Sequence, residues 1–378
     1  MNLPYSDELE IKYLSRLFDN TTQSYKFFWF QAILNNVVTG KSVISYNEIL
    51  NEMIADAWYM VTQYHLNLGP CDALESVINY IQGKSSIKPS EKKENIIEYL
   101  QKNTDSEIKK KKNILIRNVP YRLQASFVDK YKSRDWDVSK KQLIPRLNAE
   151  NHLMYYYSAP KGLETTINIC PKWSDYFQSN QEIIRGWLKY NMILYLQKRN
   201  PSVPGISDKL SLHADRNLGK VIKYWNMILD VYPLKEIYGQ NDLTKINMSI
   251  DHFVPWSFVA HNEIWNLNPT TKNINSMKSN NLPDWKTYFS KFAELEYISY
   301  KMMWKYEIIH KEFRKCAEEH LNNNLIRQRV YKEGLSYRQF YDELNDVVYP
   351  VYQSAKNCGF KNWIYSGEQN GQTMLCYD

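Results

Sequence analysis

The residues best suited to chemistry lie in one stretch, between positions 251 and 283. Asp251 and His252 follow residues 245–250, in which apolar side chains alternate as they do along a strand. Neighbouring strand side chains point to opposite faces, so Asp251 can hold a metal ion while His252 reaches a water molecule. Mg²⁺ prefers oxygen ligands and keeps several waters, so Asp251 and the amide oxygen of Asn275 would suffice. Imidazoles titrate near neutral pH, which suits His252 to act as a general base.

A short hairpin and a helix must position these side chains. Pro255 ends the first strand in a loop, and residues 265–269 can form the return strand. Residues 270–278 predict a helix, with Thr270 or Thr271 as its N-cap. A hairpin and helix of this size bury too little surface to fold alone, so flanking helices must complete their core.

The full motif is longer than the Asp-His pair. It reads Asp-His-x-x-Pro-x-Ser-Phe, then a central Asn, then Asn-x-x-Lys-Ser. The residues that form it are Asp251, His252, Pro255, Ser257, Phe258, Asn266, Asn275, Lys278 and Ser279. This pattern resembles the HNH endonucleases, whose core is a β-hairpin followed by a helix that grips one divalent metal ion. The resemblance is closest to the branch that also occurs in RNA-guided CRISPR effector nucleases. It covers about 45 of the 378 residues.

The resemblance implies a role for each motif residue. Asp251 and Asn275 match the metal ligands of the family, for one Mg²⁺ or Mn²⁺ ion, and His252 matches its catalytic histidine. Asn266 matches the residue that supports the loop carrying this histidine, and Lys278 matches a basic residue near the scissile phosphate. Asn275 stands where many members have histidine, which favours oxygen-preferring metals. By analogy, the products are 5′-phosphate and 3′-hydroxyl ends.

The net charge of +7 is concentrated in one segment. Residues 84–146 contain 17 Lys or Arg and 8 Asp or Glu, so they carry +9, and the rest of the chain carries −2. Such a segment fits a polyanion partner, and we predict that DNA is contacted by Lys109, Lys110, Lys111, Lys112 and Lys272. The alternative is a solvated surface segment that binds nothing.

The composition restricts the fold class. Glycine is scarce, 12 in 378 residues, which argues against β-sandwiches and collagen-like chains and favours helices. The five cysteines form no C-x-x-C pair, so neither a disulfide framework nor a structural zinc site is expected. No signal peptide or membrane-spanning run is evident, so we expect a cytoplasmic protein without a membrane partner. The predicted class is mainly α with a small ββα-metal module, α+β overall.

We expect four regions along the chain. They are a mainly helical region at 1–200 with the basic segment at 84–146, a helical connector at 201–237, the HNH module at 238–285 and a helical region at 286–378. Helices are predicted over residues 27–34, 47–63, 72–82 and 218–229, and over 179–198 with Ser179 as its N-cap. Short apolar runs at 114–119 and 163–170 predict strands.

The predicted activity is that of a metal-dependent DNA endonuclease in bacterial or phage defence or in restriction. No RuvC-like companion domain or ATPase P-loop is evident, and the chain is far shorter than a guide-binding effector. One HNH site cuts one strand, so double-strand breaks would imply a homodimer. The alternative is a DNA-binding or interaction subunit whose nuclease is silent until a regulatory partner protein completes it.

Overall fold

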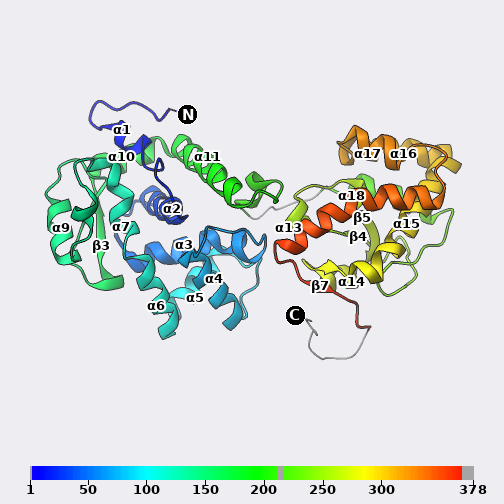
Figure 1. Cartoon of the computed structure of the whole chain (residues 1–378), viewed down its shortest axis with the longest axis horizontal. Coiled ribbons are helices and arrows are strands. Elements are labelled where there is room, and N and C mark those ends of the chain that lie inside the picture. The colour runs from blue at the N-terminus through cyan, green and yellow to red at the C-terminus, as the bar shows by residue number, and fades with distance from the viewer. Residues whose placement is uncertain (1, 212–216, 368–378) are drawn as a thin grey trace. The chain divides into compact units, whose positions relative to one another are not determined.

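The computed structural model describes residues 2–211 and 217–367, which form two compact units (Figure 1). One unit comprises Met1–Pro201 with Leu210–Leu212, and the other comprises Ser202–Lys209 with His213–Asp378. Both are mainly helical with a few short strands, which confirms the predicted fold class. No helix in the described part of the chain is long and apolar enough to cross a bilayer.

The first unit surrounds a pair of buried helices, α2 (Tyr25–Val38) and α3 (Tyr46–Thr62). Phe27–Phe30 are all buried in α2, as their apolar character predicts. Ser45 begins α3 with a capping box, in which its hydroxyl accepts from the Glu48 N–H and the Glu48 carboxylate accepts from the Ser45 N–H. Three strands lie beside these helices in the antiparallel order β1-β3-β2, namely β1 (Val43–Ser45), β2 (Tyr155–Tyr157) and β3 (Thr166–Ile169).

Smaller helices complete the first unit. They are α1 (Ile11–Ser15), α4 (Ala73–Lys84), α5 (Lys93–Lys102), α6 (Ser106–Leu115), α7 (Val119–Arg122), η1 (Leu123–Phe127), α8 (Ser133–Trp136), α9 (Lys140–Asn148), η2 (Gly162–Glu164), α10 (Pro171–Ser179) and α11 (Gln181–Arg199). Asp72 caps α4 as a helix N-cap, accepting from the Leu74 N–H at 2.8 Å.

Two local predictions in this unit are wrong. Residues 114–119 are not a strand, because Ile114 and Leu115 belong to the last turn of α6, where Leu115 is buried. Ser179 does not cap the following helix, because it is the last residue of α10, which Pro171 begins at its first turn. The strand predicted at 163–170 is present as β3.

The second unit contains the predicted hairpin. Strands β4 (Met248–His252) and β5 (Leu267–Thr271) pair antiparallel, with Asp251 opposite Asn268 and His252 opposite Leu267. Short helices α13 (Trp256–Val259) and η4 (Ile264–Asn266) lie in the connection between them. Helix α14 (Lys272–Lys278) follows β5, and the Thr271 hydroxyl caps it by accepting from the Ile274 N–H. The hairpin and the Thr271-capped helix are present as predicted, but each strand lies two to three residues later than expected and the helix begins at Lys272.

Helices from the C-terminal half of the chain pack against this hairpin. Phe253, directly after β4, stacks on Phe292 of α15 (Trp285–Lys305), with ring centroids 4.4 Å apart. Trp285 at the start of α15 in turn contacts Tyr352 of α18 (Tyr337–Asn357). The remaining elements of the unit are η3 (Ile206–Lys209), α12 (Gly219–Leu229), α16 (Glu307–His320), α17 (Asn324–Val330) and the parallel pair β6 (Leu282–Pro283) and β7 (Asn362–Trp363).

The cysteines form no disulfide among the described residues. Cys71, Cys170, Cys316 and Cys358 are free thiols, and Cys376 lies outside the described residues.

Candidate active site

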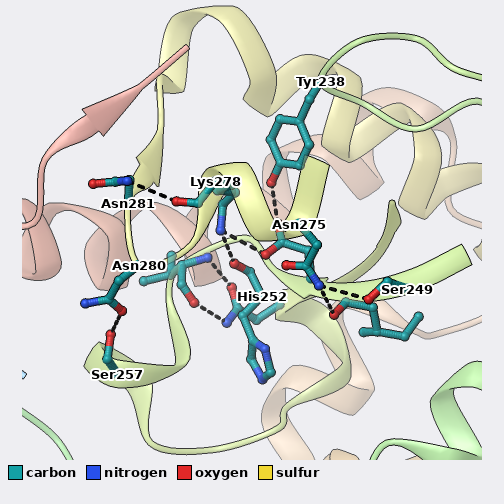
Figure 2. A network of polar contacts seen from close by, with 12 residues as sticks. Tyr238, Ser249, His252, Ser257, Asn275, Lys278, Asn280 and Asn281 are labelled. Atoms are coloured by element: carbon teal, nitrogen blue, oxygen red, sulfur yellow. Dashed lines mark hydrogen bonds and ion pairs between the residues drawn. The ribbon is translucent and has the colours of Figure 1, made fainter. Parts of the chain in front are cut away.

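Asp251 and His252 end strand β4 and are both buried. In Figure 2, Lys278, Tyr238 and Asn275 gather on one side of the strand, and the His252 ring points to the other side. This arrangement follows from the alternation of side chains along a strand. The carboxylate and the imidazole therefore have separate surroundings although they are neighbours in the sequence.

The Asp251 carboxylate is bonded at both of its oxygens. Lys278 Nζ donates to Oδ1 at 2.9 Å, and the Tyr238 hydroxyl donates to Oδ2 at 2.5 Å. Lys278 is fully buried, and burial lowers its pKa while the charge of Asp251 opposes that effect. Burial, and then the nearby Asp251 charge, raise the pKa of Tyr238 well above its ordinary value, so this phenol remains a donor.

A tight turn directs Tyr238 at Asp251. The fully buried carboxylate of Glu236 accepts from the N–H groups of Tyr238 at 2.7 Å, Gly239 at 2.8 Å and Asn241 at 2.9 Å. A Cβ at Gly239 would lie 2.7 Å from the Tyr365 ring and 2.8 Å from Asn241 Nδ2, so a larger residue would have to displace these side chains. The sequence analysis missed Tyr238, because its only local signal is the glycine that follows it.

Asn266 and Asn262 support the segment around His252. The Asn266 side chain accepts from the Val254 N–H at 2.8 Å and donates to the Val254 carbonyl at 2.9 Å. The oxygen and the nitrogen of this amide both bond the backbone of Val254, so Asn266 shapes the loop after His252 and does not face a substrate. The His252 Nε2 atom lies 3.0 Å from Asn262 Oδ1, a contact that the sequence analysis did not assign.

Asn275 presents its amide oxygen from the second turn of α14. Its Nδ2 atom donates to Ser249 Oγ at 2.9 Å and to the Ile250 carbonyl at 3.1 Å. These two bonds fix the amide so that the nitrogen faces β4 (Figure 2). The side-chain oxygen is therefore oriented as an acceptor on the other side of the amide.

The donor atoms fit a hard divalent cation. The Asp251 carboxylate and the Asn275 amide oxygen are the ligand types that Mg²⁺ prefers, and each carboxylate oxygen keeps a second lone pair. No group of three or more His, Cys, Asp or Glu residues in the described ranges is arranged to hold a metal ion. A cation here would thus rely on two protein oxygens and on water, and it would have to share Asp251 with Lys278.

The predicted DNA-contacting lysines do not share one environment. Lys109 and Lys110 are exposed on α6, and Lys272 is exposed on the first turn of α14. Lys111 is half-buried, and its Nζ lies 3.1 Å from Ser76 Oγ.

Lys112 differs from the prediction. It is only 4 % exposed, and its Nζ donates to Asn51 Oδ1 at 2.6 Å and Asn47 Oδ1 at 3.0 Å. Burial lowers its pKa to about 8. Its position on α6 explains this, since Lys112 shares the buried face with Ile108 and Leu115. Lys112 is therefore a structural side chain, and its buried amine is not placed to contact DNA.

Comparison with known proteins identifies the hairpin region. Residues 230–284 match the family model of the HNH endonucleases. No curated protein and no solved structure matches the chain. The matched range contains the hairpin, α14 and Tyr238, so this part of the chain is an HNH endonuclease domain and its substrate is nucleic acid.

Proposed function

We propose that this HNH endonuclease domain hydrolyses DNA phosphodiester bonds in a divalent-metal-dependent reaction with His252 as general base. The observation that carries the proposal is the joint placement of Asp251, His252 and Asn275 where β4 meets α14. The motif spacing supports similarity to the branch shared with CRISPR effector nucleases.

Each side chain has a role that its contacts allow. Asp251 and Asn275 would hold one Mg²⁺ or Mn²⁺ ion, which neutralises charge on the phosphate and stabilises the leaving 3′ oxygen when bound. His252 accepts the proton of the attacking water at Nδ1, since Nε2 faces Asn262. Asn266 holds the backbone that follows His252 in place.

Lys278 adds a positive charge beside the carboxylate. Its ammonium lies 2.9 Å from Asp251 Oδ1 and is the counter-ion of that carboxylate. We propose that Lys278 also lies near the scissile phosphate, because the resemblance to the family implies a basic residue there. The products would be 5′-phosphate and 3′-hydroxyl ends.

We further propose a cytoplasmic role in bacterial or phage defence or in restriction. Exposed Lys109, Lys110 and Lys272, with Lys111, would supply sequence-independent DNA affinity. Double-strand cutting would require a homodimer, because one HNH site cuts one strand.

A plasmid-nicking assay with Mg²⁺ or Mn²⁺ tests the proposal. Wild-type protein should convert supercoiled plasmid to open circles, and His252→Ala should not. Cleavage only after addition of a co-encoded protein would favour the second candidate, a DNA-binding or interaction subunit completed by a partner. Neighbouring genes discriminate the biological role, since a methyltransferase gene indicates restriction.

A further inference from the structure

The connection between the two hairpin strands lies against the imidazole of His252. Asn262 Oδ1 in this connection is 3.0 Å from His252 Nε2. An amide oxygen only accepts hydrogen bonds, so Nε2 carries the hydrogen in this contact and Nδ1 carries the lone pair. The contact therefore selects one tautomer of the ring.

Asn262 reaches the ring because the chain turns back at Ala260. Ala260 ends α13 in the left-handed conformation, with φ 54° and ψ 28°, and its N–H donates to the Trp256 carbonyl at 2.7 Å. This conformation is unfavourable for a residue with a side chain, so the surrounding contacts must hold it.

Two polar contacts anchor this connection, one buried and one partly buried, and in each the partner residue lies outside residues 230–284. Lys209 of η3 is fully buried and donates from Nζ to the Phe258 carbonyl at 2.8 Å. Glu263, which is 8 % exposed, accepts from the Asn322 N–H at 3.1 Å and from Asn322 Nδ2 at 2.7 Å. Asn322 lies between α16 and α17. Charge-assisted hydrogen bonds of this kind are stronger than neutral ones.

We infer that Asn262 is a positioning residue for His252, and that Lys209 with the Glu263–Asn322 contact braces Asn262 in place. The inference rests on the proposed function, because it concerns the proposed general base. It gives segments outside the family match a part in setting the cleavage rate. Displacement of the α16–α17 junction would shift Asn262 and release the imidazole.

The first test compares cleavage by the wild-type chain, Asn262→Leu and Asn262→Asp. Leucine removes the acceptor at similar volume, whereas aspartate keeps an oxygen in the same place. We expect kcat of Asn262→Leu to fall by about tenfold or more, but by less than the roughly 10²–10⁴-fold that removal of the base costs. Its KM should stay unchanged, and Asn262→Asp should recover most of the lost rate.

A second readout needs no cleavage. Long-range ¹H–¹⁵N spectra of histidine-labelled protein, with His252 assigned through His252→Gln, report the tautomer directly. Wild type and Asn262→Asp should show hydrogen on Nε2, and Asn262→Leu should show a mixture. Asn322→Ala should change the spectrum and kcat in the same direction, whereas Asn324→Ala, at an exposed position on α17, should change neither.

The outcomes separate this inference from the proposed function. A wild-type rate and an unchanged tautomer in Asn262→Leu would overturn the inference, even if His252→Ala is inactive. Full activity of His252→Ala would overturn the proposed function instead. Circular dichroism monitors folding, and if Asn262→Leu does not fold, Asn262→Ala and Asn322→Ala carry the same test.

Discussion

Replacing Lys278 by methionine tests whether the Lys278 ammonium is the counter-ion of Asp251. The two side chains are 0 % and 4 % exposed, so water cannot compensate the carboxylate once the ammonium is gone. The Tyr238 hydroxyl would remain, but it supplies one neutral hydrogen bond to Oδ2. Breaking a buried ion pair by removing one partner costs about 3–5 kcal/mol. We expect the free energy of unfolding of this unit to fall by about that amount in metal-free buffer.

A divalent cation should reverse much of this loss. If Asp251 holds the ion, the cation replaces the missing positive charge, and excess Mn²⁺ should restore stability to Lys278→Met. Mn²⁺ should also bind the variant more tightly than the wild type, because no ammonium competes for Oδ1. Isothermal titration calorimetry measures the affinity directly.

The assay must follow the correct unit. Hydrogen–deuterium exchange of peptides spanning residues 248–278, measured on the full chain in urea, reports the local stability with EDTA or with Mn²⁺. Lys272→Met, exposed on the same helix, is the matched control and should change stability by no more than about 0.5 kcal/mol. The double variant Asp251→Asn/Lys278→Met should regain stability, because neither member of the buried pair then carries a charge. Wild-type stability of Lys278→Met in EDTA, with unchanged Mn²⁺ affinity, would refute the counter-ion role.

Three further outcomes are expected. His252→Ala should lower the cleavage rate by about 10²–10⁴-fold and leave duplex affinity within a few-fold, and full activity would contradict the general-base role. Asp251→Ala should lose Mg²⁺-supported cleavage. Asn275→Ala loses only a neutral ligand, so Mn²⁺ should restore its cleavage better than that of Asp251→Ala. Equal, metal-independent cutting by both variants would argue against a one-ion site. Changing Lys109–Lys111 to glutamine should flatten the slope of log affinity against log salt by about 1–3 units, measured by anisotropy on a non-cleavable duplex. Lys112→Met should leave that slope unchanged, because its amine is buried; an unchanged slope in the triple variant would move the DNA footprint elsewhere.

The local elements of the site were predictable because local signals specify them. Alternating apolar residues before Asp251 predict β4, and the threonine pair before α14 predicts a helix start that Thr271 provides. The burial of Lys112 is also indicated by local spacing. Ile108 and Leu115 lie four residues before it and three after it, so all three share one helix face.

The partners of the site residues were not predictable from spacing. Tyr238 precedes Asp251 by 13 residues, and its direction depends on how Glu236 folds the turn around it. Asn262 is within the motif segment, but its contact with His252 is braced through Glu263, whose partner Asn322 is 59 residues further along the chain. Such contacts are set by tertiary packing, which no local periodicity encodes.

Residues outside the family match also contribute to the burial of the site. Phe253 stacks on Phe292 of α15, and the Tyr238 ring packs at 5.1 Å against Trp363 of β7. Asp251 and Lys278 are buried in this unit, and a charge pair in such surroundings interacts more strongly than one in water. A two-stranded sheet with one short helix cannot create this environment by itself. The matched residues therefore supply the reacting groups, while the helices around them determine how strongly Lys278, Tyr238 and a metal ion compete for one carboxylate.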